Sequence, residues 1–170
     1  MTAYVALLRA VNVGGRQLKM ADLKGIADEL KLEKARTYIA SGNLLFASDK
    51  NEADVKKQLE DAVAAHMGKP VEVMVRTVRE MAAVMKANPF ADEPANRVVA
   101  MFMDTKPPAT AVAEAKNVAD ERLELGKREI YVHFPSGQGE SKLKLGGKLV
   151  ATGRNLNTVA KLAELAREYE

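Results

Sequence analysis

The sequence predicts an α+β fold of two tandem ferredoxin-like subdomains packed together, and three observations support this prediction. Hydrophobic residues make up 47% of the chain, which is enough to bury a sizeable core. The expected elements of the first half follow the order β-α-β-β-α-β. A similar order begins again near residue 98. We therefore expect a first subdomain at 1–76, a helical connector at 77–96 and a second subdomain at 97–170 with the C-terminal helix.

The first half alternates short apolar runs with helical periodicity. Ser41-Gly42-Asn43 separates two β-rich runs and predicts an antiparallel hairpin, because glycine accepts a positive φ. Gly68 and Pro70 end the second helical pattern. The expected elements are a strand at 4–9, a helix at 20–30, strands at 36–40 and 44–48, a helix at 52–67 and a strand at 71–76.

The second half repeats this order without any letter-by-letter repeat. Its expected elements are helix 78–87, strand 98–103, helix 109–120, strands 123–125 and 130–134, a short helix within 142–150 and helix 157–168. Strands 4–8 and 98–103 are apolar at odd and even positions alike, which predicts that both faces of each central strand are covered.

Composition excludes several classes of chemistry. With no cysteine and only two histidines, disulfides, thiolate nucleophiles, iron–sulfur clusters and most transition-metal sites are poor candidates, so we expect no cofactor and no metal. No apolar run approaches the ~20 residues of a membrane helix. The N-terminus has no charged region before its apolar stretch, so we expect a cytoplasmic protein without a membrane partner.

Positive charge gathers near both ends of the chain, although the net charge is only +3. Residues 141–163 hold five basic side chains and no acid, and residues 1–24 hold four against the single Asp22. If the ends meet in space, they form a basic surface that suits an anionic partner; the alternative is a solvated basic surface. No RNA-binding sheet motif with interleaved aromatics is present.

The first candidate binding segment is the polar loop Arg9–Lys19, which leaves a strand and enters a helix. The N–H groups of a first helical turn suit an anion, and Gly14 and Gly15 would let backbone approach it closely. Arg9, Asn12 and Lys19 add charge and hydrogen-bonding groups. The loop is neither a dinucleotide nor a P-loop fingerprint, and a plain turn with solvated charges is the alternative.

The second candidate segment comprises Ser136–Lys142 and 151–158, another polar glycine loop with a helix start beyond it. Asn157, or Asn155 before it, is a plausible N-cap of the last helix. Capping does not account for Lys142 and Arg154, which suggest a second anion-holding loop.

The two histidines are weaker candidates. His66 is expected as a partly buried, hydrogen-bonded imidazole. His133 is expected as an exposed strand residue, which could act as a general base if Ser136 or Ser141 folded towards it. No pair of carboxylates has a spacing that singles it out.

Six motifs in order resemble one known family. The motifs ALLRAVNVGG, KMADL, RTYIASGNLLF, NPF, YVHFPSGQGESKL and ATGRNLNTVAKLAEL resemble the uncharacterised bacterial proteins grouped as domain of unknown function 1697, from Tyr4 to about Leu165. The resemblance implies a two-subdomain α+β fold of ferredoxin-like character and no established activity. Leu156 stands where family members commonly have Trp, which argues against an aromatic stacking platform there. The recurrent polar positions implied by the resemblance are Arg9, Asn12, Gly14, Gly15, Lys19, Thr37, Tyr38, Ser41, Gly42, Asn43, Ser141, Lys142, Thr152, Arg154, Asn155, Asn157 and Thr158.

These observations predict binding of a phosphorylated ligand, a nucleotide or a nucleic-acid backbone, in a basic cleft between the subdomains. Arg9 and Arg154 would hold it through bidentate guanidinium contacts. A hydrolase or transferase that uses the hydroxyl of Ser41 or Ser141 is one alternative, and a protein-interaction module is another. The expected ligand-binding set is Arg9, Asn12, Gly14, Gly15, Lys19, Ser41, Asn43, Lys142, Arg154, Asn155 and Asn157.

Overall fold

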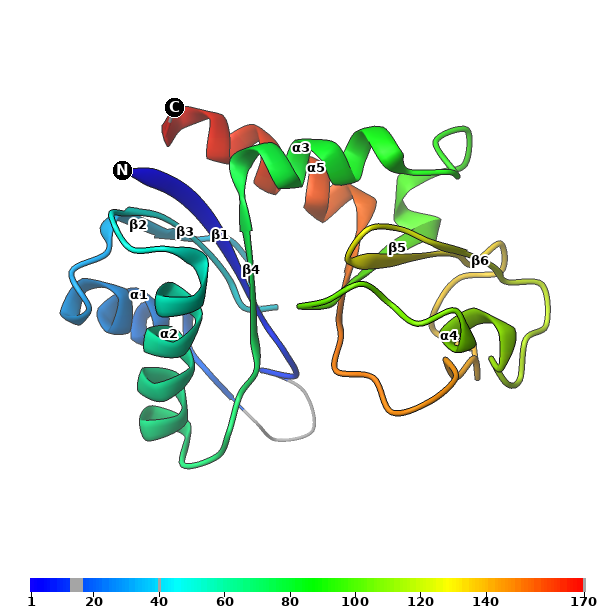
Figure 1. Ribbon diagram of the computed structural model, residues 1–170, viewed down its shortest axis with the longest axis horizontal. Helices are drawn as coiled ribbons and strands as arrows, with labels where there is room; N and C mark the ends of the chain where they lie inside the picture. The colour runs from blue at the N-terminus through cyan, green and yellow to red at the C-terminus, as the bar shows by residue number, and fades with distance from the viewer. Residues whose placement is uncertain (13–16, 40, 170) are drawn as a thin grey trace. The chain divides into compact units, whose positions relative to one another are not determined.

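The computed structural model describes residues 1–12, 17–39 and 41–169 (Figure 1). The chain divides into two compact units. Unit 1 comprises Met1–Ala82 together with Lys161–Glu170, and unit 2 comprises Ala83–Ala160. The described residues form a mixed α/β structure with two four-stranded antiparallel sheets and five α-helices.

The sheet of unit 1 has the strand order β2-β3-β1-β4, with every neighbouring pair antiparallel. One face of its strand β1, through Tyr4, Ala6 and Leu8, packs on the helices α1 and α2. Because Val5 and Leu7 on the opposite face are also fully buried, the strand is covered on both sides, as its sequence predicts. The elements are β1 (Thr2–Leu8), α1 (Met20–Glu29), β2 (Glu33–Thr37), β3 (Asn43–Ser48), α2 (Glu52–Met67) and β4 (Val73–Thr77).

The C-terminal residues of unit 1 are bonded to its sheet edge. Arg36 on β2 contacts the carboxylate of Glu168 at 2.9 Å, and the Tyr169 hydroxyl donates to the backbone oxygen of Lys34. These bonds fix the last turn of the chain, the 3₁₀ helix Arg167–Tyr169, on strand β2.

The sheet of unit 2 has the order β6-β7-β5-β8, which repeats the first sheet strand for strand. Its core joins Val99, Ile130 and Val132 of the sheet with Ala111 and with the partly buried leucines of residues 143–149. The remaining elements are α3 (Val78–Ala87), the 3₁₀ helix Ala95–Arg97, β5 (Val98–Phe102), α4 (Thr110–Ala113), β6 (Arg122–Leu125), β7 (Glu129–His133), β8 (Thr152–Asn155) and α5 (Leu156–Ala166).

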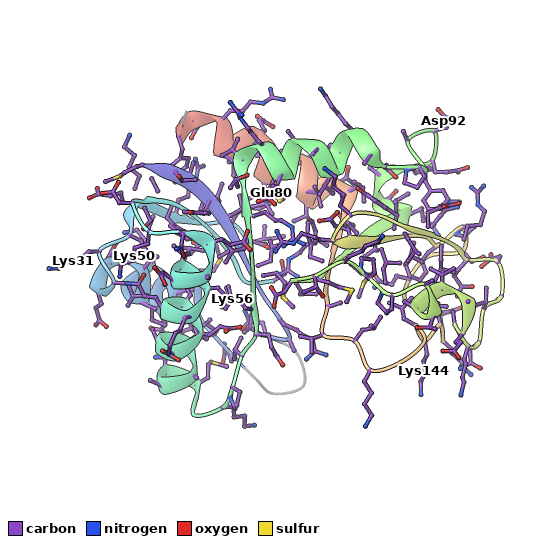
Figure 2. All side chains as sticks on the ribbon, in the orientation of Figure 1. Lys31, Lys50, Lys56, Glu80, Asp92 and Lys144 are labelled. Atoms are coloured by element: carbon purple, nitrogen blue, oxygen red, sulfur yellow. The ribbon has the colours of Figure 1, made fainter. Side chains whose placement is uncertain are left out.

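Two helix predictions for unit 2 are wrong. The helix predicted over 109–120 ends at Ala113, because the chain turns away to make a bridge between Lys116 and Lys144, the latter labelled in Figure 2. No helix forms within 142–150, where Gly147 has φ +77 and the Gly146 N–H donates to the Ala111 carbonyl at 2.8 Å. The segment is therefore an extended cover over the core and not a helix.

Strand β8 was not expected from the sequence. Its four residues Thr152–Asn155 pair antiparallel with β5, so that Arg154 lies opposite Ala100. It completes the fourth position of the second sheet. No helix in the described part of the chain combines the length and apolar character needed to cross a bilayer.

Candidate functional site

Two loops that are distant in sequence meet at the end of β1. The Leu8 N–H donates to the Gly42 carbonyl at 2.9 Å. A Cβ atom on Gly42 would lie 2.5 Å from Val11 Cγ2 and 3.0 Å from Leu8 Cβ, closer than packed atoms allow. Gly42 also has φ +85, a conformation that glycine adopts without strain. We call the described residues of the two loops and the helix entry, 9–12, 17–19, 38–39 and 41–43, the loop site.

Two asparagines hold the loop site together. Asn12 accepts the Leu18 N–H at 2.7 Å, which places the entry to α1 beside the end of β1. Asn43 is fully buried, and its amide donates to the Tyr38 carbonyl and to the Ser41 hydroxyl, both at 2.9 Å. These bonds give Asn12 and Asn43 a structural role in shaping the loops.

Several residues of the loop site have left-handed backbone. Ala10, Asn12 and Ile39 have φ of 56°, 59° and 48°. This region is costly for side chains with a Cβ, and most of all for a β-branched one such as Ile39. Strained backbone of this kind gathers at functional sites, where surrounding structure holds it in place.

Positive charge in the loop site comes from Arg9 and Lys19. Arg9 lies 3.5 Å from the Glu72 carboxylate, its N–H donates to the Glu72 carbonyl, and its side chain is 36% exposed. Lys19 is exposed and stands at the N-cap of α1, where no described side chain caps the helix. The first-turn N–H groups of α1 and its positive dipole end therefore lie next to Lys19. Gly14 and Gly15 lie outside the described residues.

Arg154, the principal candidate of the second segment, is a buried residue of β8. Its guanidinium donates to the Thr152 hydroxyl at 2.7 Å and to the Gly153 carbonyl at 2.9 Å. Burial lowers the pKa of Arg154 to about 10, so the side chain still carries its charge at neutral pH. Bonds to its own strand give this arginine a structural role that its sequence motif did not indicate.

The structure shows which of Asn155 and Asn157 caps the last helix. The Asn155 side chain accepts the Thr158 N–H at 2.9 Å and so caps α5, whereas Asn157 is an exposed residue of its first turn. The cap therefore belongs to the earlier of the two asparagines.

Removal of this cap gives a direct test. Asn155→Ala is expected to lower the free energy of unfolding by about 1 kcal/mol, because one N–H of the first turn loses its acceptor. Asn157→Ala is the matched control and should change it by less than about 0.5 kcal/mol. Urea denaturation of the two variants measures both values; equal losses would contradict the assignment.

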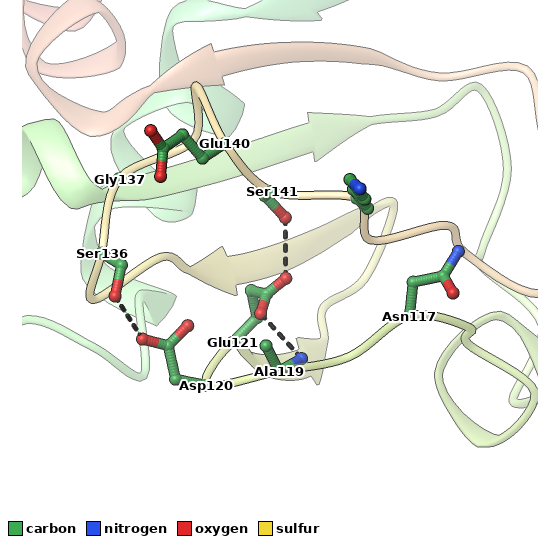
Figure 3. A pocket seen from close by; sticks show the side chains of 9 residues that line it. Asn117, Ala119, Asp120, Glu121, Ser136, Gly137, Glu140 and Ser141 are labelled. Atoms are coloured by element: carbon green, nitrogen blue, oxygen red, sulfur yellow. Dashed lines mark hydrogen bonds between the residues drawn. The ribbon is translucent and has the colours of Figure 1, made fainter.

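Lys142 lines a cavity of about 620 Å³ in unit 2 (Figure 3). The cavity carries three carboxylates, from Asp120, Glu121 and Glu140, against this single lysine. Such a wall repels a phosphate, so the anion-holding role expected for the Ser136–Lys142 loop gains no support here. The lining residues are Asn117, Ala119, Asp120, Glu121, Ser136, Gly137, Glu140, Ser141 and Lys142.

Both histidines differ from their sequence-based descriptions. His133 is buried, not exposed, because Arg122 lies 3.2 Å from its Nδ1 and the Phe90 ring packs 5.6 Å from its centroid. The hydroxyls of Ser136 and Ser141 donate to Asp120 and Glu121, and no described bond joins either to His133.

His66 was expected to be partly buried and is exposed, with its imidazole 3.6 Å from the Asp22 carboxylate. No group of three or more His, Asp and Glu in the described ranges is placed to hold a metal ion.

The family model described as "Protein of unknown function (DUF1697)" matches residues 1–131. The chain belongs to this family. The match includes the whole loop site and ends before Lys142. The structure is also similar to that of a conserved bacterial protein from Streptococcus pneumoniae, with a TM-score of 0.77 and 26% identity over 98% of this chain and 99% of that one. No curated protein matches the chain.

Neither the family description nor the name of the similar structure states an activity.

Proposed function

We propose that this protein binds a phosphorylated ligand, a nucleotide or a nucleic-acid backbone, at the loop site of unit 1. The observation that carries the proposal is the contact of Gly42 with Leu8 and Val11. Through this contact the Arg9 loop and the Ser41 loop form one surface beside the start of α1. An isolated glycine turn would offer no such combination of groups.

The groups of the loop site match the chemistry of a phosphate. A guanidinium donates two parallel hydrogen bonds to phosphate oxygens, and Arg9 is exposed enough to reach a dissolved ligand. The α1 N-terminus favours negative charge, and the ammonium of Lys19 adds to it. Glu72, 3.5 Å from Arg9, competes with a phosphate for the guanidinium. Because Arg9 and Lys19 are accessible to solvent, salt screens their attraction for a phosphate, so binding should weaken as the ionic strength rises.

We also make a proposal about the fold type of each unit. We propose that each unit is a ferredoxin-like subdomain, because both sheets share one strand order and the elements of unit 1 follow β-α-β-β-α-β. The boundaries proposed from the sequence are 1–76 and 97–170 with the connector 77–96. The expectation that the 9–19 and 142–157 segments line one basic cleft stays a prediction. The residues that support phosphate binding all belong to unit 1.

Thermal unfolding of the full chain with inorganic pyrophosphate, ATP and a short single-stranded RNA tests the proposal. A ligand at ~100 times its dissociation constant stabilises the folded chain by about 2.7 kcal/mol. The double variant Arg9→Ala/Lys19→Ala should lose this stabilisation. A response to ATP alone would identify a nucleotide, and a response to RNA alone would identify a nucleic-acid backbone.

Lys50→Ala is the control for the loss of a positive charge away from the loop site. Lys50 is exposed and follows β3 at the end opposite to the loop site, since Thr2 pairs with Ser48 and Leu7 with Asn43 (Figure 2). The control should keep the full response. Stabilisation that survives in the double variant, or that is lost equally in Lys50→Ala, would contradict a loop-site ligand.

A hydrolase or transferase is the alternative that one observation favours. The Ser41 hydroxyl lies inside the loop site and accepts a bond from the buried Asn43 amide. Turnover of a phosphoester, lost in Ser41→Ala while ATP or pyrophosphate still stabilises that variant, would establish this alternative over binding alone.

A further inference from the structure

Unit 2 holds two cavities that share one wall residue. The acidic cavity of about 620 Å³ described above and an apolar cavity of about 220 Å³ are both lined by Ser141. The apolar cavity lies over the outer part of the core, and its lining is Met101, Val132, Phe134, Gln138, Ser141, Leu143 and Leu145. The acidic cavity and the apolar cavity therefore meet at Ser141, within the 136–145 segment.

Two of the three carboxylates of the acidic cavity, those of Asp120 and Glu121, are held by hydrogen bonds before any ligand arrives. Glu121 is 8% exposed, and it accepts bonds from the Ser141 hydroxyl at 2.7 Å and the Ala119 N–H at 3.0 Å. Asp120 accepts the Ser136 hydroxyl, and Figure 3 shows both pairs facing the same cavity. Because these side chains are already ordered, a ligand loses little affinity in ordering them.

The bonds to Glu121 also keep it ionised. Hydrogen bonds from the Ser141 hydroxyl and from backbone N–H groups lower the pKa of this carboxyl below its ordinary value. With Asp120 and Glu140, three carboxylates line the cavity together with Lys142, so the excess charge of the cavity is negative. A cationic group gains Coulomb energy there, and an anionic group loses it.

We propose that unit 2 binds a small organic cation with an apolar group, such as an alkylammonium. The cation lies against Asp120 and Glu121, and the apolar group lies in the cavity lined by Phe134 and Leu143. The volume of the acidic cavity, about 620 Å³, suits a small molecule, because ligand pockets commonly measure about 300–1,000 Å³. A bare metal ion fits less well, since the described carboxylates form no group able to coordinate one.

Titration of the full chain with three probes of one length tests this inference. Hexylamine, hexanol and hexanoate share the apolar group and differ in charge. Isothermal calorimetry should show hexylamine binding at least about tenfold more tightly than hexanol, and hexanoate not binding. Amide resonances of residues 119–121 and 136–145 should shift with hexylamine. Methylamine, which lacks the apolar group, should bind at least about tenfold more weakly than hexylamine.

Variants separate the two halves of the proposed site. Glu140→Gln removes an exposed carboxylate without touching the core, and Glu121→Gln removes the buried one; each should weaken hexylamine binding several-fold. Glu124→Gln, an exposed residue of β6 outside both cavities, is the control and should bind like the unchanged chain. Equal binding of hexylamine and hexanoate, or no saturable binding of hexylamine, would overturn the proposal. So would hexylamine binding at full affinity to both single variants, Glu140→Gln and Glu121→Gln.

Discussion

Gly42→Ala is expected to lower the free energy of unfolding of unit 1 by about 3 kcal/mol or more, for two additive reasons. The backbone at Gly42 has φ +85, which costs an alanine about 1–2 kcal/mol. The new methyl would also lie 2.5 Å from Val11 Cγ2 and 3.0 Å from Leu8 Cβ, so the two loops must move apart. Hydrogen exchange of the β1 and β3 amides, read with urea denaturation, measures the loss.

Gly68→Ala separates the two causes. Gly68 ends α2 with φ +72, and a Cβ there meets no atom within 4 Å. Its alanine variant therefore has the backbone cost alone, about 1–2 kcal/mol. If Gly42→Ala costs no more than Gly68→Ala, the loops are not packed as the structure shows.

The Gly42 substitution should also impair ligand binding. In a folded Gly42→Ala chain the loops that carry Arg9 and Ser41 lie farther apart. Stabilisation by pyrophosphate should therefore fall together with the free energy of unfolding. Gly68→Ala should keep that response, because Gly68 lies outside the loop site. A folded Gly42→Ala variant with an unchanged response would separate the binding site from this loop contact.

Gly146→Ala is expected to destabilise unit 2 by about 3 kcal/mol. A Cβ at this position would lie 2.1 Å from the Thr110 carbonyl oxygen and 2.8 Å from Glu114 Cβ. The backbone of α4 cannot yield as a long side chain would, so the 142–150 cover must lift from the core. Loss of protection at the Gly146 N–H, which donates to Ala111, is the local readout.

Gly139→Ala is the control in the same unit. A Cβ on Gly139 meets no atom within 4 Å, and its φ is not positive, so the change should lie within about 0.5 kcal/mol. Equal effects of the two variants would show that residues 142–150 do not pack on α4.

The order of the elements in unit 1 could be predicted because its signals are local. Helices α2 and α3 have the predicted bounds, since an Asn51 cap and the Gly68 end mark α2 within the sequence itself. Strand β8 escaped prediction because its four residues Thr152–Asn155 carry no apolar alternation, and only pairing with β5 makes them a strand. The helix predicted within 142–150 is absent for the same reason, because contacts with α4 decide the conformation of this segment.

The candidate site could be predicted in part. Arg9 and Lys19 were visible because charge, glycine and a helix start lie together in one short segment. The placement of Ser41 and Asn43 beside them depends on the pairing of β1 with β3, a contact between distant residues that no local pattern reveals. The burial of Arg154 and His133 likewise follows from packing in the folded chain, which the local sequence of their strands does not show.

A nuclear magnetic resonance titration of the full ¹⁵N-labelled chain with pyrophosphate tests phosphate binding at the loop site. We expect saturable shifts of the Arg9, Asn12 and Ser41 amides and of the first turn of α1, and their absence in Arg9→Ala/Lys19→Ala. Saturable shifts confined to residues outside the loop site, or none up to millimolar pyrophosphate, would contradict it.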